Sequence, residues 1–261
     1  MDENNILVTG SKGGVGTSTV ALNLAVQIAQ QTRKRVALID LARPFGQISL
    51  MLDIEPRFTV LDALERIGHM DEAVLRSLTT RHKAGIEVLA GPLYVPMKPE
   101  QRQSVTLDGL VRLAAIANAA FDFVVVDVGV VNPAEWAPVL REASQILLIA
   151  EPTILALGMV RRHLAASNAV GITTEKISVV MNRWRQNDDP TLAPFEREHG
   201  RPVLAKLPND YRQVTEAVAM GMPLAGSQNN VLLSRYRDLA EWLVRNIVAA
   251  KVAEIDVRAA V

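Results

Sequence analysis

Glycines, a lysine and several hydroxyl residues are concentrated in one short run near the start of the chain. Glycine allows backbone conformations in which successive N–H groups point into the same space, and such a cradle binds anions. The run follows the apolar segment Ile6–Thr9 and opens the helical pattern Thr17–Gln31, whose dipole would also favour negative charge there. This context predicts a phosphate-binding loop rather than a plain glycine-rich turn. Its residues are Ser11, Lys12, Gly13, Gly14, Val15, Gly16, Thr17, Ser18 and Thr19.

Two aspartates end apolar segments downstream of this loop. Asp40 is the last residue of Val36–Asp40, and Asp127 is the last residue of Phe123–Asp127. Since the carboxyl ends of parallel strands meet at one edge of a sheet and Mg²⁺ prefers oxygen ligands, we predict a metal site formed by Ser18 and Asp127. Asp40 is interpreted as a further catalytic acid, with a strand-end cap as the alternative.

Short apolar runs alternate with helical patterns along the chain, and this alternation predicts the elements that position the loop. The runs are rich in Val, Ile and Leu without polar alternation, which is typical of parallel strands buried on both faces. The pattern predicts a single α/β domain over residues 1–261, with one doubly wound, mostly parallel sheet flanked by helices. The expected strands are Ile6–Thr9, Val36–Asp40, Glu87–Ala90, Phe123–Asp127, Ile146–Ala150, Ile177–Met181 and Val203–Lys206. The expected helices are Thr17–Gln31, Leu107–Ala120, Glu135–Ala143, Ile154–Asn168, Tyr211–Met220 and Val231–Val252. Two segments, Leu41–Arg57 and Trp184–Arg201, are predicted as loops with short helical turns.

The composition excludes several classes of site. The 261 residues contain no cysteine, which rules out disulfides and thiolate metal sites and fits a reducing, cytoplasmic location. The formal net charge is zero, so the chain as a whole has no electrostatic attraction to nucleic acid or anionic membranes. The N-terminus lacks the basic residues of a signal peptide, and no apolar run reaches the roughly 20 residues that span a bilayer.

The loop resembles the deviant Walker A family of nucleotide-binding proteins, which includes chromosome-partitioning and division-site ATPases of the ParA/MinD type. Lys12 matches the signature lysine, which in the family reaches the partner subunit's nucleotide. The resemblance therefore implies ATP or ADP with Mg²⁺, a homodimer formed through the nucleotide face, and catalytic roles for Lys12, Asp40 and Asp127. Thr17 departs from the family because it stands where the usual P-loop lysine would be, and Ala42 stands where the second acid of an Asp-x-Asp pair is expected. These losses predict weak or absent hydrolysis, and whether the chain is an enzyme stays open.

Two later segments also resemble the family. Asn182 and Arg183 end a predicted strand, where the family places an asparagine that hydrogen-bonds adenine. Pro208, Asn209 and Asp210 resemble the loop that packs against the base. The bland alternatives are an asparagine cap and a proline turn.

The pilus-assembly branch named CpaE or TadZ shares the sequence around Thr17, the run after Asp40 and the segment starting at Glu151. This likeness implies a localisation factor for a type IVb (tight adherence, or Tad) pilus machine, with pilus or secretion proteins as partners. The chain starts almost at its first strand, so we expect no N-terminal receiver-like domain. We expect a cytoplasmic protein, recruited to a cell pole or to the inner face of the membrane.

Two other functions stay open. A partitioning-type ATPase would bind DNA nonspecifically through basic side chains. The favoured alternative is that these side chains are ordinary solvated cations. A MinD-like positioning ATPase would bind membranes through its C-terminal helix, but the apolar stripe of that helix reads better as core packing, because its end carries few cations. The candidate DNA-binding residues are Arg161, Arg162, His163, Arg183, Arg185 and Arg212. The stripe residues are Leu232, Leu233, Tyr236, Leu239, Leu243 and Ile247.

Overall fold

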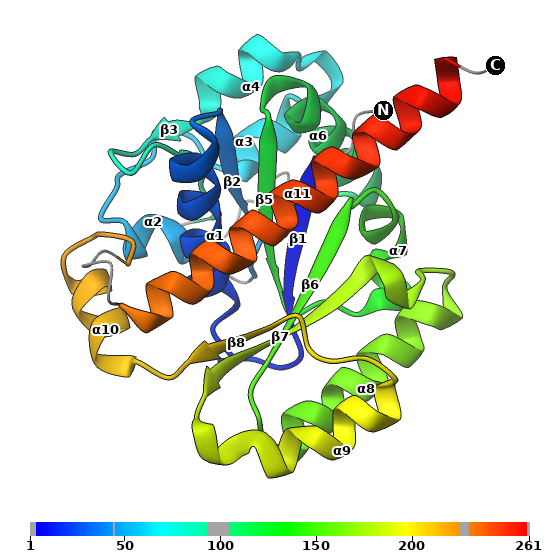
Figure 1. Ribbon diagram of the computed structural model, residues 1–261. Coiled ribbons are helices and arrows are strands. Elements are labelled where there is room, and N and C mark those ends of the chain that lie inside the picture. Colours follow the sequence, from blue (N-terminus) through cyan, green and yellow to red (C-terminus); the bar gives the residue numbers. More distant parts are fainter. Residues whose placement is uncertain (1–3, 44, 93–104, 225–229, 260–261) are drawn as a thin grey trace.

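The computed structural model describes residues 4–43, 45–92, 105–224 and 230–259, with side chains described as far as residue 249. An eight-stranded sheet runs through the molecule in the order β3-β4-β2-β5-β1-β6-β7-β8, and helices cover both of its faces (Figure 1). Every neighbouring pair is parallel except β3 and β4. The strands are β1 (Asn5–Gly10), β2 (Val36–Asp40), β3 (Thr80–Arg81), β4 (Glu87–Leu89), β5 (Phe123–Gly129), β6 (Gln145–Ala150), β7 (Ile177–Trp184) and β8 (Ala205–Pro208). The expected mostly parallel, doubly wound sheet is confirmed.

The helices form one layer on each face of the sheet. They are α1 (Thr17–Thr32), α2 (Ile48–Met51), α3 (Val60–Glu65), α4 (Glu72–Leu78), α6 (Leu107–Ala120), α7 (Pro133–Arg141), α8 (Ile154–Ala169), α9 (Asp189–His199), α10 (Tyr211–Ala219) and α11 (Val231–Ala259). The described residues also contain the short 3₁₀ helices η1 (Ile67–His69), η2 (Thr174–Lys176) and η3 (Gln186–Asp188).

The alternation of side chains along the central strands divides the core into two clusters. In β1, Ile6 and Val8 belong to the cluster with α1 and α11, whereas Leu7 belongs to the cluster with α6, α7 and α8. Successive strand residues point to opposite faces, so an unbroken apolar run is what a strand covered on both sides requires. The sheet therefore separates two hydrophobic cores, one on each of its faces.

The long C-terminal helix α11 lies across the sheet next to α1 (Figure 1). Its apolar stripe is buried in the α1 cluster, and Gln31 at the end of α1 donates a hydrogen bond to the Arg237 carbonyl at 3.0 Å. The prediction that this stripe is core packing is confirmed. The stripe residues are Leu232, Leu233, Tyr236, Leu239, Leu243 and Ile247.

One segment predicted as a loop is a helix. Residues 189–199 form α9, although the run contains Pro190 and Pro194. Pro190 lies in the first turn, where backbone N–H groups have no partner within the helix. Leu192 and Phe195 of α9 are buried in the core cluster that also contains residues of α8. Burial of this short apolar face outweighs the hydrogen bond that Pro194 removes.

The remaining differences include element boundaries, since β5 continues to Gly129 and β7 continues to Trp184. The sequence did not indicate the two-residue strand β3 or the short helices α3 and α4, and β8 begins at Ala205 instead of Val203. Within the described residues, no helix is long and apolar enough to cross a membrane.

Candidate nucleotide-binding site

The loop between β1 and α1 has the backbone geometry that its glycines predict. Gly14 and Gly16 have φ angles of 80° and 92°, in the left-handed region that favours glycine. A β-carbon at Gly16 would collide with the side-chain amide of Asn182 on β7, whereas one at Gly13 would meet no atom within 4 Å. Gly16 is thus required both by its conformation and by the close approach of β7.

Asn182 ties the end of β7 to this loop. Its Nδ2 atom donates a hydrogen bond of 2.8 Å to the carbonyl of Val15, and the residue is buried. The sequence predicted that Asn182 would hydrogen-bond adenine. In this structure its amide nitrogen is bonded to the loop, beside the predicted phosphate site, and the adenine contact stays a prediction.

The two predicted aspartates lie side by side. Asp40 at the end of β2 is in register with Asp127 on β5, and both residues are fully buried. Asp127 Oδ1 accepts a hydrogen bond from the Gly129 N–H at 3.0 Å, but its Oδ2 atom is buried and accepts no well-formed hydrogen bond from the described residues. Burial raises the pKa of Asp127, and the nearby Ser18 hydroxyl opposes this shift.

These features fit a magnesium ion. The Oδ2 atom of Asp127 has no hydrogen-bond partner among the described residues and lies near the hydroxyl of Ser18 at the start of α1. These are oxygen ligands of the kind that Mg²⁺ uses alongside nucleotide phosphates. The buried Ser11 hydroxyl also has no partner among the described residues. These polar groups therefore have hydrogen-bonding capacity that the described residues do not use.

Asp40 has a different environment. Its Oδ1 and Oδ2 atoms each accept a backbone N–H, from Ala42 and Ile48 respectively, at 3.1 Å. Burial, with the charge of Asp127, raises the pKa of Asp40 to about 7, while these backbone hydrogen bonds lower it. Asp40 thus holds the loop between β2 and α2, as the cap alternative expected, and it shares a buried electrostatic environment with Asp127.

Ala42 lies where the missing second acid would be. It is buried, and a β-carbon built on Gly129 would lie 3.5 Å from the Ala42 side chain. Position 42 therefore lies next to Gly129, two residues after Asp127. Alanine provides no oxygen atom at this position.

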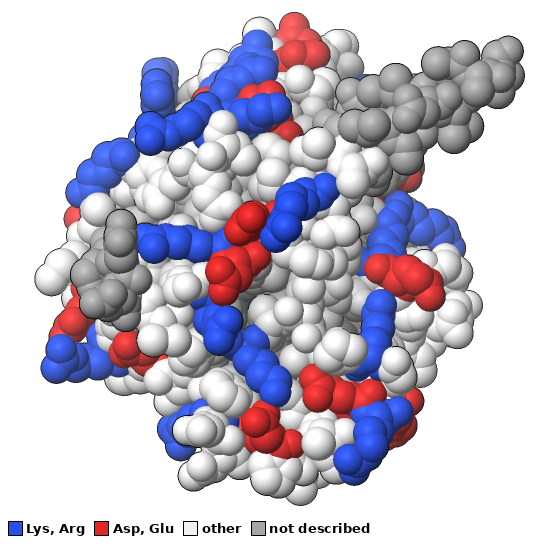
Figure 2. All heavy atoms as spheres, viewed as in Figure 1, with Lys and Arg blue, Asp and Glu red and all other residues white. Residues whose placement is uncertain are grey.

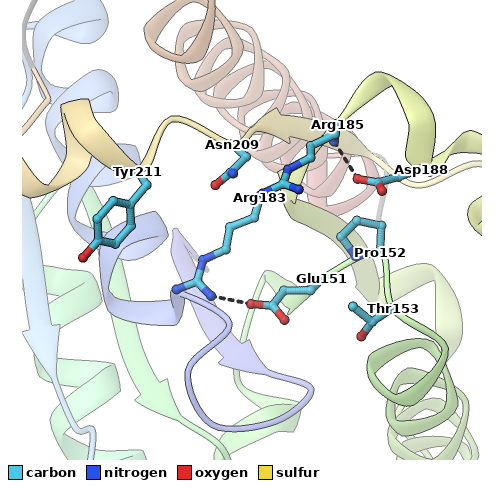
Figure 3. A pocket seen from close by; sticks show the side chains of 8 residues that line it. All are labelled: Glu151, Pro152, Thr153, Arg183, Arg185, Asp188, Asn209 and Tyr211. Carbon is cyan, nitrogen blue, oxygen red and sulfur yellow. Dashed lines mark hydrogen bonds and ion pairs between the residues drawn. The ribbon is translucent and has the colours of Figure 1, made fainter.

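A pocket of about 480 Å³ opens beside the phosphate loop, at the carboxyl ends of β6, β7 and β8 (Figure 3). Of the residues predicted to contact the base, it includes Arg183 and Asn209. Asp210 instead caps α10, accepting the Gln213 N–H at 3.0 Å, and Pro208 ends β8. The lining residues are Glu151, Pro152, Thr153, Arg183, Arg185, Asp188, Asn209 and Tyr211.

A carboxylate binds two cations between the loop and this pocket. Glu151, which follows β6, pairs through Oε2 with Lys12 Nζ at 3.2 Å and through Oε1 with Arg183 Nη1 at 2.5 Å. Figure 3 shows the Arg183 side chain extending from β7 to Glu151. From the sequence, Glu151 indicated only a likeness to the pilus-assembly branch, and no role in the site was predicted for it. Its position directly after an apolar strand was the available signal for a role in the site.

Several candidate residues of the DNA-binding alternative are paired with acids in the single chain. Basic and acidic side chains are interspersed on the face that α11 crosses (Figure 2). Of the candidate residues, Arg161 pairs with Glu198 and Arg212 with Glu216. The inclusion of His163 was wrong, because this residue is buried in α8 and burial lowers its pKa to about 4.

Comparison with known proteins identifies the same fold. Residues 6–224 match the model of the CobQ/CobB/MinD/ParA nucleotide binding domain. The septum site-determining protein MinD of Thermotoga maritima is 22% identical over 245 residues, which cover 91% of this chain and 86% of that protein. A ParA family ATPase from Chlorobium tepidum has a TM-score of 0.81 at 20% identity, with 91% of this chain and 98% of that one covered. MinD of Pyrococcus horikoshii, solved with Mg-ADP, has a TM-score of 0.73 at 20% identity, with coverage of 93% and 96%.

Proposed function

Because this chain belongs to the CobQ/CobB/MinD/ParA nucleotide-binding family, we propose that it is a dimeric switch that binds ATP or ADP with Mg²⁺. The observation that carries the proposal is the buried Oδ2 atom of Asp127, which has no hydrogen-bond partner among the described residues. It lies near Ser18, which follows a loop with two left-handed glycines. This is a site with acceptors for a metal ion and backbone donors for an anion.

The residues have distinct roles in this proposal. Backbone N–H groups from Ser11 to Thr19 surround the phosphates, and Ser18 and Asp127 hold Mg²⁺. The metal supplies charge neutralisation of the phosphates when it is bound. The pocket beyond Arg183 takes the ribose and base, with Asn182 and the segment 208–210 along its edge.

Hydrolysis is slow or absent in the proposed switch. Thr17 supplies no positive charge to the phosphates, and Ala42 supplies no carboxylate to orient water. Removing one charge-stabilising group typically lowers kcat by about 10²–10³-fold. The protein therefore acts mainly through its bound state, as a nucleotide-locked dimer in which Lys12 reaches the second subunit's nucleotide.

The biological role that we propose is that of a localisation factor for a type IVb (Tad) pilus assembly machine in the bacterial cytoplasm. The support is the likeness to the CpaE/TadZ branch at Thr17 and at the segment from Glu151. Partners would be pilus or secretion proteins, and contact with the membrane would be indirect.

Calorimetry with MgADP and with a non-hydrolysable MgATP analogue tests the core of this proposal. We expect saturable binding of one nucleotide per chain, and loss of the Mg²⁺-dependent part of the affinity in Asp127→Asn. A dimer should form with the MgATP analogue, and phosphate release should be near background. Absence of binding at millimolar nucleotide would overturn the proposal, and rapid turnover that requires Asp127 would overturn the slow-switch part of it.

A MinD-like positioning ATPase is the second candidate, favoured by the extended similarity to the Thermotoga maritima protein. Co-sedimentation with anionic vesicles, with and without MgATP, separates the two candidates. Nucleotide-dependent binding that is lost on removal of residues 250–261 would favour the second. A partitioning-type role would instead give DNA binding with a steep salt dependence.

A further inference from the structure

Glu151 forms an ion cluster with Lys12 and Arg183 beside the phosphate loop. Lys12 belongs to the loop itself, and Arg183 follows the residue that donates to the Val15 carbonyl. Both cations are paired with the same carboxylate, whose side chain is only 14% exposed. The cluster therefore places two cations against one anion at the entrance of the site.

The position of Arg183 is unusual in its backbone as well. Its φ angle of 55° lies in the left-handed region, which non-glycine residues rarely adopt because the conformation is strained. Ala150 on β6 is in register with Met181 on β7, so the residues that follow lie next to each other at the sheet edge. The left-handed turn coincides with a side chain that extends to Glu151 beside the loop (Figure 3).

A polyphosphate bound to the loop would change the balance within this cluster. It would bring several negative charges close to a mostly buried carboxylate, and the repulsion is strong where water is scarce. Arginine also forms short, paired hydrogen bonds with phosphate oxygens. Because Thr17 provides no charge, the guanidinium of Arg183 is a cation of the same chain that is available to neutralise the phosphates, held by the carboxylate that also contacts Lys12 of the loop.

We propose that Arg183 replaces the missing P-loop lysine by binding the nucleotide phosphates, and that Glu151 is a positioning residue that holds Arg183 in the free protein and releases it to them. This inference rests on the proposed nucleotide binding. Binding then exchanges one anion partner of Arg183 for another. Glu151 lowers affinity for phosphate while keeping the arginine ordered at the site.

Calorimetric affinities for MgADP and for magnesium tripolyphosphate test the exchange. Arg183→Gln should weaken both by about tenfold or more, because a hydrogen bond to a charged group is lost. Glu151→Gln should strengthen both by roughly three- to tenfold, because the competing carboxylate is gone. In the double variant with Arg183→Gln, this gain should disappear. The pair Arg161 and Glu198, 2.6 Å apart on α8 and α9, provides matched controls, and Arg161→Gln and Glu198→Gln should change neither affinity.

Each contrary result has a clear meaning. If Glu151→Gln strengthens binding equally with and without Arg183, the carboxylate only repels phosphate, and the exchange is wrong. If Arg183→Gln weakens MgADP but not tripolyphosphate, the arginine acts on the nucleoside and the proposal fails. If the wild-type protein binds and Arg183→Gln binds equally well, this inference alone is overturned. If the wild-type protein binds neither ligand, the proposed function falls together with it.

Discussion

The Nζ atom of Lys12 lies 3.2 Å from Oε2 of Glu151 on the same chain. The family resemblance assigns this lysine to the nucleotide of a second subunit, so the contact within one chain must break before a cross-subunit contact can form. The lysine side chain is 29% exposed, and Glu151 keeps Arg183 as a second partner when the lysine leaves. The ion pair between Lys12 and Glu151 can therefore break at a small cost in free energy when a phosphate competes for the lysine.

Lys12→Ala should prevent nucleotide-dependent dimerisation and leave the free protein folded. Light scattering after size exclusion, with and without the MgATP analogue, measures the first effect, and thermal denaturation measures the second. Lys206→Ala is a matched control. Lys206 on β8 pairs with Asp189 on α9 at 2.7 Å, and its side chain is about as exposed as that of Lys12. A Lys12→Ala protein that still dimerises with nucleotide would contradict the cross-subunit role.

Gly16→Ala should destabilise the free protein by roughly 1–3 kcal/mol, because alanine is strained at a φ angle of 92° and its methyl group would displace Asn182 from the loop. Chemical denaturation without nucleotide measures the change. Gly13→Ala tests the same substitution three residues earlier, where a β-carbon meets nothing within 4 Å, and should leave stability nearly unchanged. Equal losses in the two variants would show that the contact with Asn182 does not decide the requirement.

The central sheet could be predicted from the sequence because its strands are continuous apolar runs. Val36–Asp40 forms a strand with the predicted bounds, and Leu107–Ala120 forms a helix with the predicted bounds. The helix α9 could not be predicted in this way, because its two prolines argue against a helix. The burial of Leu192 and Phe195 in the folded protein favours the helix. Short elements such as β3 depend on pairing with a neighbour and carry almost no pattern of their own.

The candidate site was predictable in its loop and less so in its surroundings. Glycine spacing in the run 10–16 predicts a turn whatever the rest of the chain does, and two of these glycines do have positive φ angles. The partners of Glu151 and of Asn182 depend on which strands are neighbours. The order β1-β6-β7 brings these residues to the loop, although more than 130 residues separate them from it along the chain.

Thr17→Lys combined with Ala42→Asp should raise the rate of phosphate release by about tenfold or more, because each change restores a charged group beside the reacting phosphate. Thr17 opens α1 next to the left-handed Gly16, and position 42 faces Gly129 near the metal site. Steady-state phosphate release with MgATP measures the effect. The gain should vanish when Asp127→Asn is added, and a rate that stays at the wild-type level would show that other features suppress hydrolysis.

His163→Leu should reduce the loss of stability in acid. His163 is buried in α8, its two ring nitrogens have no hydrogen-bond partner among the described residues, and burial lowers its pKa from 6.5 to about 4, a shift that the Val131 backbone opposes. Between these pH values the unfolded chain binds a proton that the folded chain does not. Stability from this residue is therefore fully present above about pH 6.5 and is lost as the pH falls toward 4.

Urea denaturation of the wild-type protein and His163→Leu at pH 7.5 and pH 5 measures this contribution. The wild type should lose roughly 2 kcal/mol more than the variant between the two pH values, given the cited shift. Asp40 contributes with the opposite sign, since its raised pKa makes the folded chain bind the extra proton, so only the difference between the two proteins isolates the histidine. Leucine leaves no buried polar atom without a partner, and stability at pH 7.5 should be equal or higher. Identical pH dependence in both proteins would mean that the His163 ring finds a partner when protonated and that its pKa is not lowered by burial.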